Sequence, residues 1–362
     1  MTDLNETYVG TTEVRAQHRF DEGALERYLS ARIPGFTGPI AVEQFKGGQS
    51  NPTYRITAGG RRYVLRRKPP GQLLPSAHAV DREYKVMTAL GATDFPVPKT
   101  YLLCDDPSLI GTPFFVMDNV DGRIFWEQSL PGMSNAERAA IYDEMNRVIA
   151  LLHSIDYQAI GLADYGRPGN YFSRQIKRWT DQYRASETER IEAMDNLIAW
   201  LPGNIPEGDD AVANSAIVHG DYRLDNMVFH PSAPRVLAVL DWELSTLGHP
   251  LADFSYHCMS WHIAPGSFRG IGGLDLKALG IPSEAEYIAR YCERTGRAGI
   301  AHWDFYLAFS LFRIAGILQG IAKRALIGTA SSAQAVETGK RARPMAELGW
   351  QHAERALRGT TT

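Results

Sequence analysis

Residues 217–243 constrain this chain more than any other segment. Apolar residues lead into the turn His219-Gly220-Asp221, Asn226 follows the aspartate by five positions, and the apolar residues 236–240 run into Asp241. Apolar runs this short, bounded by turn residues, predict β-strands. The pattern therefore predicts that Asp221, Asn226 and Asp241 surround one point.

These three side chains are the types that phosphoryl transfer from ATP requires. In such a transfer the protein positions the acceptor hydroxyl and holds Mg²⁺ against the phosphates. Asp221 would accept or orient the hydroxyl proton, while Asn226 and Asp241 would supply oxygen ligands to Mg²⁺. The order His-x-Asp-x-x-x-x-Asn, then a strand, then Asp is that of the catalytic and metal-binding loops of protein kinases.

Two departures from that order narrow the class of enzyme. Gly220 stands where regulated protein kinases carry Arg, and the metal-binding loop reads Asp-Trp-Glu instead of Asp-Phe-Gly. The chain instead resembles the aminoglycoside phosphotransferase and choline kinase family. This resemblance implies a protein-kinase-like fold, a small-molecule acceptor, and structural, bracing roles for Asp253 and His219.

The first third of the chain predicts an N-lobe built on a five-stranded antiparallel sheet with one helix. Glycine-rich turns separate β-branched or alternating segments, which predicts strands over residues 40–45, 53–57, 62–67, 99–104 and 112–117 and a helix over 79–90. We expect a flexible N-terminus over residues 1–20 and a nucleotide-binding N-lobe over 21–118. The fold class is therefore α+β, two-lobed and protein-kinase-like.

The loop over residues 46–52 is a candidate to cover the phosphates. Its glycines would let the backbone approach closely, and Ser50 or Asn51 could donate hydrogen bonds. The loop lacks the Gly-x-Gly-x-x-Gly spacing, so a plain hairpin turn is the alternative.

The other candidate nucleotide contacts follow along the N-lobe. Val64 and Arg66 share one face of a predicted strand, so Val64 could touch adenine while Arg66 reaches the phosphates. By resemblance Arg66 fills the family's nucleotide-binding Lys position, although Arg is not a neutral replacement for Lys; a solvated basic edge is the alternative. Glu83 is the best partner for Arg66, unless it is a plain surface residue. Backbone groups near Met117 and Val120, at the turn-rich hinge, would bind the adenine edge.

Residues 119–362 predict a mainly helical C-lobe that carries catalysis and acceptor binding. Ser134 with Glu137, and Ser283 with Glu286, have the spacing of capping boxes. Further helices are expected over residues 171–185, 187–200, 302–327 and 333–357. The apolar stretch 305–318 is too short to cross a bilayer and contains an arginine, so we expect a buried helix and no membrane span.

Composition argues against several other classes of protein. The formal net charge of −3 gives no basic face for nucleic acid. Three widely spaced cysteines, without a Cys-x-x-Cys motif, indicate reduced thiols, and His257 and His262 lack a zinc-helix motif. The N-terminus is polar and lacks the apolar core of a signal peptide. We therefore expect a cytoplasmic enzyme.

The residues alone leave the acceptor open. Polycationic aminoglycosides would favour an acidic rim and choline an aromatic cage, yet the C-lobe aromatics have the helical spacing of core residues. Residues 48–54, 64–71 and 218–255 resemble the phosphotransferase domain joined to acyl-CoA dehydrogenase domains in some lipid-degrading proteins. This resemblance implies a hydroxylated acyl-CoA as acceptor and a separate acyl-CoA dehydrogenase acting later.

Three hypotheses follow from the sequence. The first is an ATP- and Mg²⁺-dependent kinase of a small-molecule hydroxyl, for which basic residues within 174–184 could meet coenzyme A phosphates or simply form a solvated helix face. The second is an aminoglycoside kinase. The third is a nucleotide-binding protein without turnover, which would not need Asp221, Asn226 and Asp241 together.

Overall fold

The computed structural model describes residues 10–46, 51–70, 79–328 and 335–359. The chain divides into two compact units, each assembled from separated stretches. Unit 1 comprises Met1–Trp126, Gln158–Tyr165 and Leu224–Ser245, and unit 2 comprises Glu127–Tyr157, Gly166–Arg223 and Thr246–Thr362. One boundary falls directly after Arg223, so Asp221 belongs to unit 2, whereas Asn226 and Asp241 belong to unit 1.

Unit 1 is built on an antiparallel sheet of six strands in the order β1-β2-β3-β4-β6-β5. The strands are β1 (Thr11–Thr12), β2 (Ile40–Phe45), β3 (Thr53–Ala58), β4 (Arg61–Arg67), β5 (Thr100–Cys104) and β6 (Phe114–Asp118). The last five match the predicted strands to within two residues at either end. The prediction of only five strands was wrong, because the two residues of β1 are too few to form a recognisable pattern; they pair with Gln44 and Phe45 of β2.

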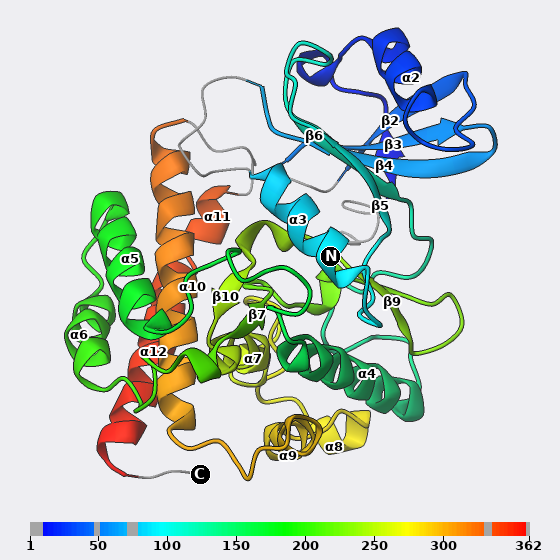
Figure 1. Ribbon diagram of the computed structural model, residues 1–362. Coiled ribbons are helices and arrows are strands. Elements are labelled where there is room, and N and C mark those ends of the chain that lie inside the picture. The colour runs from blue at the N-terminus through cyan, green and yellow to red at the C-terminus, as the bar shows by residue number, and fades with distance from the viewer. Residues whose placement is uncertain (1–9, 47–50, 71–78, 329–334, 360–362) are drawn as a thin grey trace. The chain divides into compact units, whose positions relative to one another are not determined.

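The two faces of this sheet carry different residues. One face packs against α2 (Glu22–Ser30) in an apolar core that includes Leu25 and Leu65. Because side chains alternate along a strand, the next residue, Arg66, points to the opposite face. On that side α3 (Val80–Leu90) contacts β5 and β6, as Figure 1 shows. The alternation of β4 therefore turns Arg66 toward α3 and away from the apolar core.

A second, smaller sheet in unit 1 positions the predicted metal ligands. Strands β8 (Met227–Phe229) and β9 (Val236–Val239) pair antiparallel, with Met227 opposite Val239. Asn226 immediately precedes β8, and Asp241 follows β9 by two positions. Because the strands run antiparallel, these two residues lie at the same end of the hairpin.

Unit 2 is mainly helical, with one two-stranded sheet of β7 (Ala216–Val218) and β10 (Thr246–Gly248). Its helices are α4 (Asn135–Ser154), α5 (Tyr171–Ser186), α6 (Glu192–Trp200), α7 (Pro250–Cys258), α8 (Leu276–Leu279), α9 (Glu284–Thr295), α10 (Trp303–Leu326), α11 (Ala335–Gly339) and α12 (Ala342–Leu357). The two predicted capping boxes are formed, at the starts of α4 and α9. Helix α10, orange in Figure 1, contacts α5, α7, α11 and α12.

Helix α10 is the main core helix of unit 2. With 24 residues it is longer than the apolar stretch seen in the sequence, and by length and composition alone it could cross a membrane. However, 78% of its most apolar window is buried inside the protein. This burial is what a central helix of a large helical unit requires.

The C-terminal region differs from its prediction as one helix. The chain forms α11 and α12 instead, separated at Lys340 and Arg341. Gly339 ends α11 close to α10, where an added Cβ would lie 2.6 Å from the Cβ of Ala322. This close approach favours glycine, and glycine in turn favours a break in the helix.

Candidate active site

The turn that carries Asp221 follows β7 in unit 2 and is held from two directions. Gly220 has φ of +81°, a conformation that residues with a Cβ rarely adopt. The carboxylate of Asp253, on α7, accepts hydrogen bonds from the backbone N–H groups of His219 at 2.7 Å and Gly220 at 2.8 Å. Arg313, on α10, donates to the carbonyl of Gly220 at 2.6 Å. Asp253 thus makes the bracing contacts expected of it.

The carboxylate of Asp221 is surrounded by donors. The hydroxyl of Tyr256 donates to Oδ1 at 2.8 Å, and Nη2 of Arg223 lies 3.1 Å from Oδ2. Burial raises the pKa of Asp221, but Arg223, the Tyr256 hydroxyl and Arg269 outweigh burial and bring that pKa below its usual value. Asp221 is therefore ionised at neutral pH, so it can orient an acceptor hydroxyl and accept its proton as the bond to phosphorus forms.

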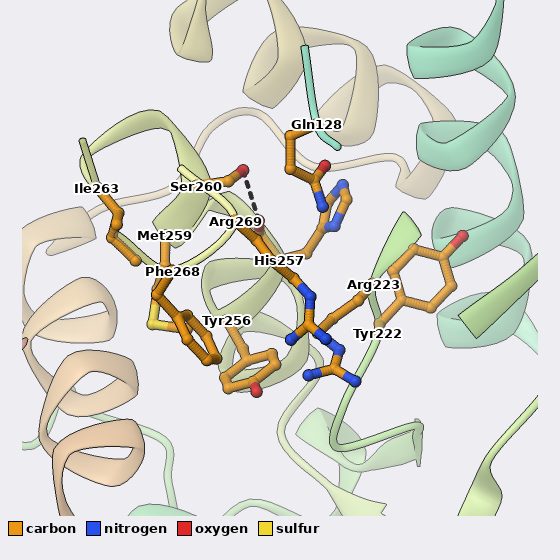
Figure 2. Close-up of a pocket in the computed structure, with 10 residues that line it drawn as sticks. All are labelled: Gln128, Tyr222, Arg223, Tyr256, His257, Met259, Ser260, Ile263, Phe268 and Arg269. Carbon is orange, nitrogen blue, oxygen red and sulfur yellow. Dashed lines mark hydrogen bonds between the residues drawn. The ribbon is translucent and has the colours of Figure 1, made fainter. Parts of the chain in front are cut away.

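A small pocket of about 20 Å³ adjoins these residues. Its lining combines apolar side chains with two cations: Gln128, Tyr222, Arg223, Tyr256, His257, Met259, Ser260, Ile263, Phe268 and Arg269. Figure 2 shows the guanidinium groups of Arg223 and Arg269 on the side of the pocket where the Tyr256 ring lies. The volume is about that of one water-sized group.

In unit 1, Arg66 is surrounded by three carboxylates. Its Nε lies 2.9 Å from Oε2 of Glu83, and its Nη2 lies 2.6 Å from Oδ1 of Asp241 and 3.6 Å from Oε2 of Glu243. The side-chain amide of Asn51 donates to Glu83 at 3.0 Å and to Glu243 at 3.4 Å. We call Asn51, Arg66, Glu83, Asp241 and Glu243 the Arg66 cluster.

The Arg66 cluster contains more negative than positive charge. Burial raises the pKa of Glu83 to about 7; Arg66 opposes this change, while Asp241 and Glu243 add to it. Burial alone would lower the pKa of Arg66, but the three carboxylates more than compensate and raise it above its ordinary value. Arg66 therefore stays charged, and a further cation near Asp241 would relieve the surplus of negative charge.

The end of the β8–β9 hairpin offers ligands that suit Mg²⁺. Leu240 donates its backbone N–H to the carbonyl of Asn226 at 2.8 Å, which links the two strand ends. Asp241 adopts a left-handed conformation, with φ of 67° and ψ of 59°, which is uncommon for a residue other than glycine and typical of functional sites. An amide and a carboxylate oxygen fit Mg²⁺, which takes few protein ligands and completes its shell with phosphates and water. No group of three metal-binding side chains occurs among the described residues.

The remaining predicted nucleotide contacts lie in different settings. Ser50 falls outside the described residues. Asn51 is fully buried and directs its amide to the carboxylates of the Arg66 cluster. Val64 lies opposite Met117 across β4 and β6, and both are less than a tenth exposed, whereas Val120 is half-buried. Their roles in adenine binding stay predictions.

Comparison with known proteins identifies the family. Residues 41–309 match the family model described as "Phosphotransferase enzyme family". The chain belongs to this phosphotransferase family. The match contains the Arg66 cluster, the predicted Mg²⁺ ligands and the braced turn of Asp221.

Among curated proteins, this phosphotransferase is similar to much longer chains. It is 49% identical over 347 residues to acyl-CoA dehydrogenase family member 10 of Mus musculus, covering 95% of this chain and 32% of that protein. It is 45% identical over 351 residues to acyl-CoA dehydrogenase family member 11 of Homo sapiens, covering 95% of this chain and 44% of that protein. The chain thus spans less than half of these relatives.

Solved structures share the fold of this phosphotransferase. A Ralstonia eutropha protein, provisionally named as an aminoglycoside phosphotransferase, is 64% identical with a TM-score of 0.86, covering 93% of this chain and 99% of that one. An aminoglycoside phosphotransferase in ternary complex with ADP and hygromycin B is 14% identical with a TM-score of 0.60, covering 94% and 99%. Choline kinase from Cryptosporidium parvum is 13% identical with a TM-score of 0.59, covering 94% and 97%. The predicted protein-kinase-like fold is therefore confirmed.

Several residues at the site were not predicted from the sequence. Arg223 could have been proposed as a site residue from the sequence, because it lies two positions after Asp221. Tyr256, Arg269 and Arg313 could not, since each comes from a distant segment and is brought to the Asp221 turn only by tertiary packing.

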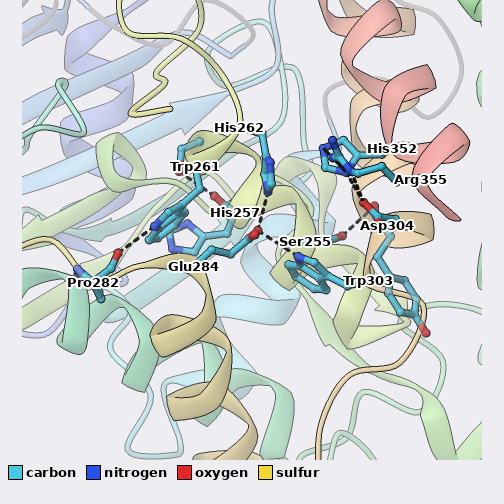
Figure 3. Close-up of polar contacts among 12 residues, drawn as sticks. Ser255, His257, Trp261, His262, Pro282, Glu284, Trp303, Asp304, His352 and Arg355 are labelled. Carbon is cyan, nitrogen blue, oxygen red and sulfur yellow. Dashed lines mark hydrogen bonds and ion pairs between the residues drawn. The ribbon is translucent and has the colours of Figure 1, made fainter. Parts of the chain in front are cut away.

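The two histidines of unit 2 considered for a zinc site contact other side chains. Nε2 of His257 lies 2.8 Å from the Tyr287 hydroxyl, and Nε2 of His262 lies 2.8 Å from Oε1 of Glu284. Glu284 also accepts a hydrogen bond from Nε1 of Trp303 at 3.0 Å, and Figure 3 shows this network. These contacts join the α7 region to α9 and α10, so both histidines have structural roles.

Most basic side chains of α5 contact neighbouring residues of the protein. Arg174 donates to the carbonyls of Gly169 and Arg167, Lys177 pairs with Asp181 at 2.8 Å, and Arg184 pairs with Asp195 at 2.8 Å. Arg178 is exposed, with its guanidinium over the Trp179 ring. These contacts favour a solvated helix face over a site for coenzyme A phosphates.

Proposed function

We propose that this phosphotransferase transfers the γ-phosphoryl group of ATP, with Mg²⁺, to the hydroxyl of a small molecule. The observation that carries the proposal is the setting of Asp221, an ionised carboxylate on a doubly braced turn, bonded to Tyr256 and Arg223. A carboxylate in this state can align an acceptor hydroxyl for attack.

The nucleotide half of the reaction would use unit 1. Asn226 and Asp241 would hold Mg²⁺, which when bound neutralises phosphate charge. Arg66, fixed by Glu83, would orient the phosphates and keep Asp241 in place. Val64 and the backbone near Met117 and Val120 would bind the adenine edge, and Ser50 or Asn51 would donate to the phosphates. We assign nucleotide binding to residues 21–118, and catalysis, metal binding and acceptor binding to residues 119–362.

For the acceptor we propose a hydroxylated acyl-CoA. Support comes from the relatives named acyl-CoA dehydrogenase family members, of which this chain matches only part. A phosphorylated hydroxyl is a better leaving group than a free one, so a separate acyl-CoA dehydrogenase could act later on the same carbon chain. An aminoglycoside is the second candidate, because the 64% identical structure carries that name.

The test is a panel of acceptors assayed for ADP release. Purified protein with ATP and Mg²⁺ is incubated with hydroxyacyl-CoAs, with the matching acyl-CoAs that lack the hydroxyl, and with aminoglycosides. We expect ADP release only with hydroxyacyl-CoAs. Turnover of aminoglycosides alone would replace our acceptor with the second candidate, and nucleotide binding without turnover of any acceptor would support a non-catalytic protein.

A further inference from the structure

We propose that Arg269, together with Arg223, binds the oxygens of the phosphoryl group as it reaches the acceptor hydroxyl at Asp221. The inference rests on the proposed function and deepens it, because it assigns a catalytic residue and an oxyanion site in unit 2 to the same reaction.

The charges around Asp221 support an oxyanion site. The ten pocket residues include Arg223 and Arg269, and none of these ten described residues is acidic. With Asp221 beside them the three charged groups sum to +1. Arg269 lines the same pocket as Arg223 and Tyr256, which both contact the Asp221 carboxylate, and it contributes to lowering the pKa of that carboxyl. A surplus of positive charge next to the carboxylate that holds a hydroxyl suits an anion bonded to that hydroxyl oxygen.

The backbone places Arg269 here under strain. Arg269 has φ of +51°, which is uncommon for a residue other than glycine. The loop around it is packed closely: Ile271 donates its N–H to Ser260 at 2.7 Å, and Gly272 donates to Ile263 at 2.9 Å. A Cβ on Gly270 would lie only 1.9 Å from the carbonyl oxygen of Ile263. Strain that the surrounding contacts maintain is typical of functional residues.

The chemistry of the transfer explains why phosphoryl oxygens must come to this place. The acceptor oxygen forms a bond to phosphorus, the bond from phosphorus to the ADP oxygen breaks, and Asp221 receives the hydroxyl proton. Since the new bond forms on the oxygen held by Asp221, the phosphoryl oxygens arrive beside it. The pocket has room for about one oxygen-sized group, which fits a phosphoryl oxygen.

The alternative ligand of Arg269 is an anionic group of the acceptor itself. The two ligands predict different kinetic effects of a substitution at Arg269. Loss of a residue that contacts the phosphoryl group should lower kcat for every acceptor. Loss of a residue that binds an acceptor anion should raise KM for anionic acceptors only.

The kinetic experiment compares Arg269→Gln, Arg269→Lys and the wild type on anionic and neutral hydroxyl acceptors of equal length. Arg190→Gln is the control, because that side chain is 79% exposed. We expect Arg269→Gln to lower kcat about 100-fold for both kinds of acceptor, with Arg269→Lys recovering part of the loss. An unchanged kcat, or a rise in KM confined to anionic acceptors, would overturn the assignment.

A binding experiment separates this inference from the acceptor proposal. Thermal unfolding is measured with ADP and Mg²⁺, with and without tetrafluoroaluminate, which mimics a phosphoryl group in transfer. We expect tetrafluoroaluminate to stabilise the wild type and Arg190→Gln further, and Arg269→Gln to lose that increment while keeping the one from ADP. If Arg269→Gln keeps both increments, the inference fails. If the wild type gains the increment yet phosphorylates no hydroxyacyl-CoA, only the proposed acceptor fails.

Discussion

The Arg66 cluster and the surroundings of Asp221 have opposite arrangements of charge. In unit 1 one guanidinium is shared by three carboxylates, and the surplus negative charge contributes to raising the pKa of Glu83 to about 7. In unit 2 the Asp221 carboxylate contacts Arg223 and the Tyr256 hydroxyl, Arg269 lines the same pocket, and the pKa of the carboxyl is lowered. The first arrangement suits a bound cation and the second an oxyanion, which are the two partners that phosphoryl transfer requires.

Removing the central carboxylate of unit 2 should have the largest effect. We expect Asp221→Ala to lower kcat by at least about 10³-fold, because the carboxylate that aligns the hydroxyl is lost, while the affinity for Mg²⁺-ATP changes little. Tyr256→Phe keeps the carboxylate and loses one donor, so we expect a loss of only about tenfold. ADP release and nucleotide titration measure both. A wild-type rate in Asp221→Ala would show that the catalytic assignment is wrong.

Removing a predicted metal ligand from unit 1 should affect binding before catalysis. At ATP concentrations about 100 times the dissociation constant, Mg²⁺-ATP should stabilise the wild type by about 2.7 kcal/mol. We expect Asp241→Asn and Asn226→Ala to lose most of the Mg²⁺-dependent part of this increment, measured by thermal unfolding with and without EDTA. Asp105→Asn, at an exposed position of unit 1, is the control. A full Mg²⁺-dependent increment in both ligand variants would contradict the assignment.

The two pKa shifts predict that pH acts on unit 1 and not on Asp221. Protonation of Glu83 below pH 7 removes a charged partner of Arg66, so kcat/KM should fall about tenfold from pH 7.5 to 6. Asp221, with its lowered pKa, stays ionised throughout this range. We expect Glu83→Gln to abolish the pH dependence and Tyr256→Phe to keep it.

The same shift has a consequence for stability. Because folding raises the pKa of Glu83 from 4.5 to about 7, the folded state binds its proton more tightly. The resulting gain in unfolding free energy is complete below pH 4.5 and disappears as the pH rises through 7. Relative to Glu83→Gln, the wild type should therefore lose stability between pH 5 and pH 7, measured by denaturant titration. An increase over this range would contradict the shift.

The smallest effect is expected on α5, outside both the Arg66 cluster and the surroundings of Asp221. If the basic face of α5 is merely solvated, Lys177→Gln and Arg178→Gln should change kcat/KM for a hydroxyacyl-CoA by less than about twofold. A larger rise in KM for the acyl-CoA than for the same acceptor without coenzyme A would instead indicate that this face binds its phosphates. Arg190→Gln serves again as the control.

The sequence predicted the regular elements of the fold well. Alternation and turns gave β2 to β6, and cap spacing gave the starts of α4 and α9, because those signals are local. The strand β1 and the break between α11 and α12 were missed, since each depends on a distant partner: Gln44 and Phe45 in one case, the close packing on Ala322 in the other.

The sequence alone also determined the family and the candidates Asp221, Asn226, Asp241 and Arg66, because the spacing of a catalytic loop is a local property of the chain. Only the tertiary structure decided how each group is charged and held. The pairing of Arg66 with Glu83 was expected from the sequence, but the structure added Glu243 to Arg66 and brought Tyr256 and Arg269 to the surroundings of Asp221. The physical reason is that a pKa depends on burial and on charges nearby in space, and residues far apart in sequence become neighbours only when the chain folds.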